Sequence, residues 1–88
     1  MLFDLGAVVA TPSCLRHCLK NNVDPMLLIQ RHAAGDWGDV GSEDFDANNY
    51  AIKYSLRVFS SYRVGDDKVW CITEADRSST CLLLPPEY

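Results

Sequence analysis

The sequence contains no apolar run long enough to cross a bilayer, since its longest runs are Leu5–Ala10 and Leu82–Leu84. No positively charged segment precedes an apolar stretch near the first residue, so the pattern of a secretion signal is missing. We therefore expect a cytoplasmic protein without membrane contact. Basic residues are also few, with 8 Lys and Arg against 12 Asp and Glu. This balance argues against direct nucleic-acid binding, which needs clustered positive charge.

Linkers, internal repeats and low-complexity stretches are missing as well, so we expect a single domain over residues 1–88. A chain of this length buries only about two thirds of its unfolded surface, which leaves little room for a deep substrate cleft. Its hydrophobic content of 48% is nevertheless too high for a disordered chain.

The four cysteines are numerous for so short a chain, and they leave a metal site or a disulfide open as alternatives. Cys14, His17 and Cys18 lie close together, but Cys-x-x-His-Cys is not a standard zinc spacing. A tetrahedral site would need Cys71 or Cys81 from far along the chain. We expect reduced thiols that pack as small hydrophobic groups, with no bound zinc and no cofactor.

Two helix starts are visible in the first third of the chain. Thr11-Pro12 and Asp24-Pro25 each combine a capping side chain with proline at the first helical position. We expect the first helix to end at Asn21-Asn22 and the second at Gly35, because Asn and Gly commonly end helices.

The second half of the chain changes to a strand pattern. It predicts three strands, Arg57–Val64, Lys68–Thr73 and Thr80–Leu84. If both connecting turns contain an odd number of residues, Trp70 lies in the core, opposite Tyr62 and Leu82. The same register places Cys71 directly opposite Cys81.

Two further elements complete the predicted fold. Residues 2–10 are predicted to form a short strand, and Ser42 is predicted to cap a third helix whose apolar residues recur with helical spacing. The expected class is α+β, with a short N-terminal strand and three helices packed on one face of a three-stranded antiparallel meander.

The segment Asp36-Trp37-Gly38-Asp39 is a first candidate site. Its carboxylates could serve acid–base or metal chemistry with His32 as the base. The ordinary alternative is a turn, since Asp often bonds its own backbone there. Trp37 either covers the end of the core or anchors a partner.

A second polar segment carries more charge than a hairpin turn needs. It contains Glu74, Asp76, Arg77 and Ser78. Arg77 could pair with the acids beside it, tie this loop to the first segment, or lie on an outward surface. A triad of Ser78, His32 and Asp76 can be drawn, but the sequence lacks a nucleophile elbow.

Several segments resemble a family of small bacterial proteins of unknown function, carried by plasmids and phages. These segments, which cover most of the chain, are LGAVVATP, RHAAGDWGDV, EDFDANNYAIK, RVFSSY and KVWCITEADRSSTCLLLPPEY. Some family members carry a loose label that links them to restriction-modification systems. The label does not imply a methyltransferase core here, because the chain is short and has no glycine-rich loop after a strand.

The small size, the lack of a catalytic signature and the resemblance to mobile-element proteins together favour a small binding protein, not an enzyme. Its expected partner is a host or mobile-element protein, such as part of a restriction or CRISPR-type defence complex. The binding surface is predicted at both polar segments: Asp36, Trp37, Asp39, Glu74, Asp76, Arg77 and Ser78. The alternative is a small hydrolase or metal-dependent enzyme that uses His32, Asp36 and Asp39.

Overall fold

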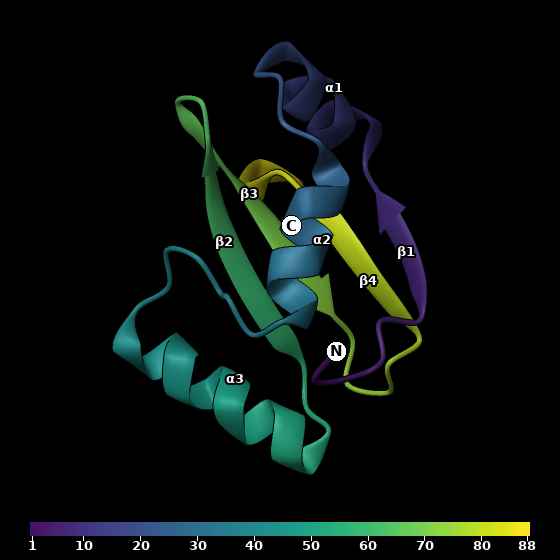
Figure 1. Cartoon of the computed structure of the whole chain (residues 1–88), viewed down its shortest axis with the longest axis vertical. Coiled ribbons are helices and arrows are strands. Elements are labelled where there is room, and N and C mark those ends of the chain that lie inside the picture. Colours follow the sequence, from purple (N-terminus) through teal and green to yellow (C-terminus); the bar gives the residue numbers. More distant parts are fainter.

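The computed structural model describes all 88 residues as three helices and a four-stranded mixed sheet (Figure 1). In chain order the elements are β1 (Ala7–Ala10), α1 (Pro12–Lys20), α2 (Pro25–Ala33), α3 (Ser42–Tyr54), β2 (Val58–Val64), β3 (Asp67–Thr73), β4 (Ser79–Leu83) and the 3-10 turn η1 (Pro85–Glu87). The predicted α+β class is confirmed. None of the helices is long and apolar enough to span a bilayer.

The N-terminal strand is shorter than the predicted 2–10 and belongs to the sheet. β1 pairs in parallel with β4, so the strand order is β1-β4-β3-β2 and the predicted three-stranded meander is only part of the sheet. Gly6 makes this pairing possible. Its φ is +64°, and a Cβ there would lie 2.3 Å from the carbonyl oxygen of Arg77.

The first two helices start as predicted, because Thr11 and Asp24 accept hydrogen bonds from backbone amides of the first helical turn. The third start is one residue off. Gly41 is the N-cap of α3, and Ser42 is already helical. No side chain caps this helix, so its N-terminus relies on Glu43 and the neighbouring Asp44, whose negative charges suit the helix dipole.

The predicted register of the three antiparallel strands is wrong by one residue. A two-residue turn, with Gly65 at a φ of +64°, joins Val64 directly to Asp67. Tyr62 therefore lies opposite Val69, not opposite Trp70. The connection from β3 to β4 also has an even count, with six residues between the paired Thr73 and Thr80. Both slips therefore fall on β3, which alone presents the opposite face from the one predicted.

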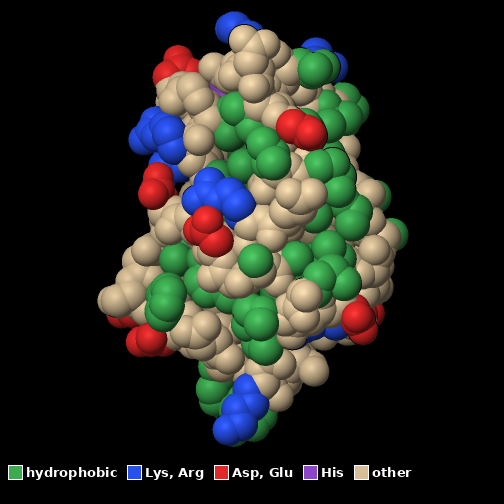
Figure 2. All heavy atoms as spheres, viewed as in Figure 1, with side chains coloured by type: hydrophobic (Ala, Val, Ile, Leu, Met, Phe, Trp, Pro, Cys, Tyr) green, Lys and Arg blue, Asp and Glu red, His purple; other side chains and the backbone are tan.

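The core lies between the helices and one face of the sheet, which we call the inner face. Its main cluster joins α1 and α2 to the three antiparallel strands: Cys14, Cys18, Leu28, Ile29, Tyr62, Val64, Val69, Cys71 and Leu82. A smaller cluster under α3 contains Trp37, Ala51 and Val58. The view from the helix side shows hydrophobic side chains also at the surface, around the place where Figure 1 draws α2 and β1 (Figure 2).

The free edge of β2 is closed by other parts of the chain. The Asn48 side chain on α3 donates to the carbonyl oxygen of Phe59 (2.6 Å) and accepts from its N–H (2.9 Å). Further along, the Ser61 amide donates to the carbonyl oxygen of Trp37, and its carbonyl accepts from the Asp39 amide. A side-chain amide and a short extended segment thus take the place of a neighbouring strand.

We predict that Asn48→Ala lowers the free energy of unfolding by about 2 kcal/mol, because two hydrogen bonds at a largely buried position are lost. The next residue, Asn49, is exposed, so Asn49→Ala is the matched control and should change stability little. Chemical denaturation of both variants measures the difference. Equal stabilities would mean that α3 does not hold this edge.

Candidate functional site

The face of the sheet opposite the helices, here called the outer face, carries a strip of aromatic residues. The ring centroids of Phe59 and Trp70 are 5.2 Å apart, and those of Trp70 and Tyr88 are 5.8 Å apart, both edge to face. Trp70 lies between Ser61 and Leu83 in the sheet. The prediction that Trp70 is core beneath the helices is therefore wrong: it is half-buried on the other side.

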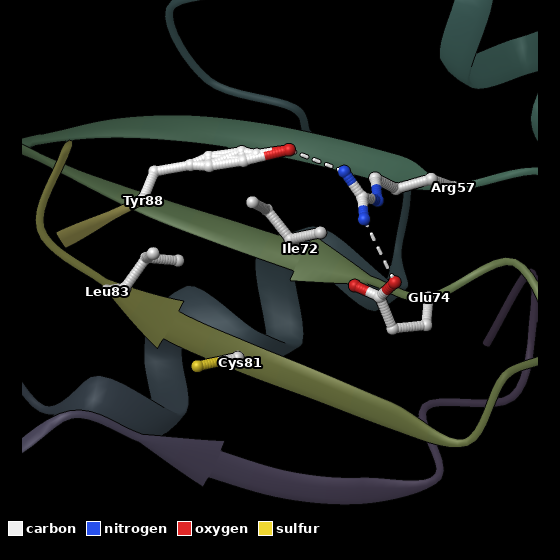
Figure 3. Close-up of a pocket in the computed structure, with 6 residues that line it drawn as sticks. All are labelled: Arg57, Ile72, Glu74, Cys81, Leu83 and Tyr88. Carbon is white, nitrogen blue, oxygen red and sulfur yellow. Dashed lines mark hydrogen bonds and ion pairs between the residues drawn. The ribbon is translucent and has the colours of Figure 1, made fainter.

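An arginine links the end of the chain to the two middle strands. Arg57 donates to the hydroxyl of Tyr88 (2.5 Å) and to the carboxylate of Glu74 (3.1 Å), as Figure 3 shows. The carboxylate of Glu74 raises the pKa of Arg57 further above its ordinary value. The guanidinium also lies 5.9 Å from the centre of the Tyr88 ring.

These groups surround a shallow hollow of about 180 Å³ on the outer face (Figure 3). Its lining consists of Arg57, Ile72, Glu74, Cys81, Leu83 and Tyr88. Burial raises the pKa of Cys81, so this residue is a neutral thiol at neutral pH. The hollow thus combines an apolar floor with one ion pair at its rim.

The residues of the first polar segment are engaged within the molecule. Asp36 pairs with Arg31 (2.6 Å), which lowers the pKa of the carboxyl, and it also accepts from the amide of Gly38. Asp39 lies 3.3 Å from the ammonium group of Lys68. Trp37 is 3% exposed, which confirms that it covers the end of the core.

The side chains of the second polar segment also form hydrogen bonds within the molecule, to the backbone of their own loop and to the end of α3. The side chain of Ser78 and then its amide (3.0 Å) hydrogen-bond to Asp76, and both lower the pKa of the Asp76 carboxyl. Arg77 donates to the carbonyl oxygens of Leu56 (2.6 Å) and Ala51 (3.0 Å) at the end of α3. Its guanidinium is directed back toward the helix, whereas the prediction placed it on an outward surface.

The structure does not merge the two polar segments into one site. Asp39 lies beside Ser61, whose partner across the sheet is Trp70. Glu74 follows Trp70 by four residues, about 13 Å along an extended chain. Only Glu74, among the seven residues of the predicted surface, borders the hollow on the outer face.

His32 is fully buried and both of its ring nitrogens are occupied. Nδ1 lies 2.5 Å from the hydroxyl of Ser60, and Nε2 lies 2.9 Å from that of Thr73. Thr73 in turn bonds Thr80 (2.6 Å), which donates to the carbonyl oxygen of Leu5 (2.8 Å). Burial lowers the pKa of His32 to about 4, so the ring is neutral at neutral pH.

This placement separates the residues of the two catalytic alternatives. His32 is internal, while Asp36 and Asp39 are exposed and paired with Arg31 and Lys68. Neither ring nitrogen of His32 is left to face Ser78, the nucleophile of the drawn triad. No open pocket therefore collects a base together with these acids.

The cysteines do not form a metal cluster, since no group of three or more His, Cys, Asp or Glu side chains is close enough to hold an ion. Cys14 and Cys18 are buried in α1, and burial raises the pKa of Cys14 to about 12. The predicted facing of Cys71 and Cys81 is wrong, because Cys71 lies on the inner face and Cys81 on the outer face. All four thiols are free.

Comparisons with protein-family models, with curated proteins and with solved structures each found no match to this chain. The resemblance to a plasmid- and phage-borne family therefore stays a prediction. Sequence reasoning missed the outer face because the register was off by one. The Gly-Asp pair at 65–66 was the signal that could have found it, since such pairs favour two-residue turns.

We predict that stability falls as the pH drops from 6.5 toward 4, because His32 takes up a proton at about 6.5 when unfolded but only at about 4 when folded. The expected loss over this window is about 3 kcal/mol. His32→Gln, which keeps a polar side chain but does not titrate, should flatten the dependence. Urea unfolding across this pH range measures both proteins, and identical slopes would refute the assignment.

We predict that Arg77→Lys lowers the free energy of unfolding by about 1–2 kcal/mol, because a single ammonium group cannot reach both carbonyls at the end of α3. The matched control is Arg63→Lys on the exposed side of β2, which should be close to neutral. Thermal melts compare the two. An unchanged Arg77→Lys melt would mean that the guanidinium does not hold α3.

Proposed function

We propose that this chain is a binding module that contacts another protein through the outer face of its sheet. The observation that carries the proposal is the strip of Phe59, Trp70 and Tyr88 on the face that no helix covers, with Arg57 at its border. Aromatic residues and arginine are enriched where proteins bind one another, and they supply most of the binding energy there.

The dimensions of the face favour a protein over a small molecule. The hollow of about 180 Å³ is smaller than the roughly 300–1,000 Å³ of ordinary small-molecule sites. Tyr88 is 63% exposed, so a partner could remove a large aromatic surface from water. The ion pair of Arg57 and Glu74 would lie at the rim of such a contact, where it adds orientation more than affinity.

The placement of the catalytic candidates supports binding over catalysis. His32 is buried, neutral and without access to solvent, so it is suited to holding elements together. The two acids that would act with it, Asp36 and Asp39, form ion pairs with Arg31 and Lys68. Burial raises the pKa of all four cysteines, which makes them poor nucleophiles at neutral pH.

The identity of the partner is the finer part of the proposal. We favour a host protein, and the family resemblance points to a component of a restriction or CRISPR-type defence complex that the chain would inhibit or assist. The acidic composition, with a net charge of −4, suits a protein partner better than nucleic acid.

We predict that Tyr88→Ala and Arg57→Ala each weaken the partner's affinity by roughly tenfold or more while the fold is kept. Both side chains are exposed, so the loss of stability should be small. The partner is first isolated from cells with the immobilised wild-type chain, then purified and titrated by calorimetry. Tyr54→Ala on α3 is the control, because Tyr54 is 53% exposed and lies outside the outer face.

Full affinity in both outer-face variants would refute this surface. Loss of affinity in the Tyr54→Ala control alone would instead place the contact on α3. Substitution of Asp39, which belongs to the earlier predicted surface, distinguishes the two predictions in the same titration.

A further inference from the structure

β1 is an outer strand whose free edge is open. It pairs with β4 only, and it forms one rim of the molecule in Figure 1. Val8 and Val9 are 44% and 49% exposed. The strand Ala7-Val8-Val9-Ala10 contains no charge and no proline, which are the features that usually keep edge strands apart.

The hydrogen bonds to β4 fix which backbone groups of β1 are free. The amides of Ala7 and Thr11 donate to carbonyl oxygens of Ser78 and Leu82 on one side of the strand. Alternate residues of a strand direct their N–H and C=O groups to opposite sides. The two residues whose backbone groups point away from β4 are therefore Val8 and Ala10.

The other edge of the sheet is treated differently. Asn48 satisfies the outward groups of Phe59 on β2, and the segment at Asp39 satisfies those of Ser61. No comparable bond reaches Val8 or Ala10 from outside the sheet. The molecule thus closes one edge with its own side chains and backbone and leaves the other available for pairing.

An uncharged apolar surface borders this open edge on the helix side. Two hollows of about 250 and 340 Å³ adjoin there and share Met26 and Ile29. Their lining also includes Met1, Val8, Val9 and Leu15, and no side chain that lines either hollow is charged. Figure 2 shows hydrophobic side chains gathered over this region.

We propose that β1 pairs with β1 of a second copy of this chain, antiparallel, about a two-fold axis at Val9. In this register Val8 of each copy faces Ala10 of the other, so that the free donors and acceptors form four reciprocal hydrogen bonds. The sequence Ala-Val-Val-Ala presents only small and apolar side chains to itself. A two-fold contact requires such self-complementarity, since the same patch occurs on both sides.

The exposed apolar side chains supply more than half of the area that a standard interface buries on each partner. Met1, Val8, Val9, Leu15 and Met26 are between 41% and 85% exposed. Together they present on the order of 500 Å² of apolar surface, against the roughly 800 Å² that each partner buries in a standard interface. The remainder would come from the backbone of the edge strand and from neighbouring polar groups. None of the lining side chains carries a charge, so like-charged side chains do not face each other across the paired strands.

Val9 offers a sharp test because the axis places its two copies directly opposite each other, with Cα atoms about 4.5 Å apart. Like charges in such a pair oppose association. Sedimentation should find the wild type as a dimer, and both Val9→Lys and Val9→Glu as folded monomers of 9.9 kDa. An equal mixture of the two variants should form a heterodimer, since the opposite charges then attract.

The outcomes separate this pairing from other uses of the edge. The controls Tyr54→Lys and Tyr54→Glu, at a similarly exposed position on α3, should stay dimeric alone and gain nothing from mixing. A wild type that is monomeric at high micromolar concentration would overturn the proposal and leave the edge to a strand of another protein. A dimer that persists in both Val9 variants would overturn the register. Neither result depends on Tyr88 or Arg57. The outer-face proposal is tested by the partner titration of their variants, so the two proposals can fail independently.

Discussion

A buried imidazole decides which face of the sheet is the core. His32 has no access to water, so each ring nitrogen needs a partner inside the protein. Ser60 and Thr73 supply those partners from β2 and β3, and Thr80 extends the chain of hydroxyls to β4. The four side chains join α2 to all three antiparallel strands, and nothing buried among them is left without a hydrogen bond.

This requirement explains why the face of β3 that packs against the helices is the opposite of the one that its hydrophobic pattern predicts. With Thr73 inside, the alternation of a strand also turns Val69 and Cys71 inward and Trp70 and Ile72 outward. The inward side chains are small, which lets α2 approach the sheet. Burial of the largest apolar residues would have favoured the opposite choice, but it would have left the imidazole without a partner on β3.

Features of the fold that depend on residues close together in the sequence could be predicted, whereas features that depend on distant residues could not. Helix starts at Thr11 and Asp24 depend on neighbouring residues and were predicted correctly. The register depends on the length of each turn, and an error of one residue in that length moves every side chain of the following strand to the other face. The parallel pairing of β1 with β4 joins the two ends of the chain, and no local pattern reports it.

The candidate site shows the same division. The charged residues of the two polar segments are predicted to face a partner, but in the structure they bond within the molecule. Asp36 pairs with Arg31 and accepts from the amide of Gly38. Asp76 accepts from the amide of Ser78, and Arg77 donates to the carbonyl oxygen of Ala51. Such internal roles are visible only when the partners are known in space. The aromatic strip was hidden for the opposite reason, because a tryptophan in a strand is most simply assigned to the core.

The sheet has two faces and two edges, and the chain covers one of each. Helices fill the inner face, and Asn48 with the segment at Asp39 closes the β2 edge. The two proposals assign the remaining boundaries: the outer face to a partner protein and the β1 edge to a second copy. They are compatible, because the two-fold axis of antiparallel edge pairing is perpendicular to the sheet. Both aromatic strips would then lie on the same side of one continuous sheet, and a partner with two matching sites would gain from effective concentration without any new contact.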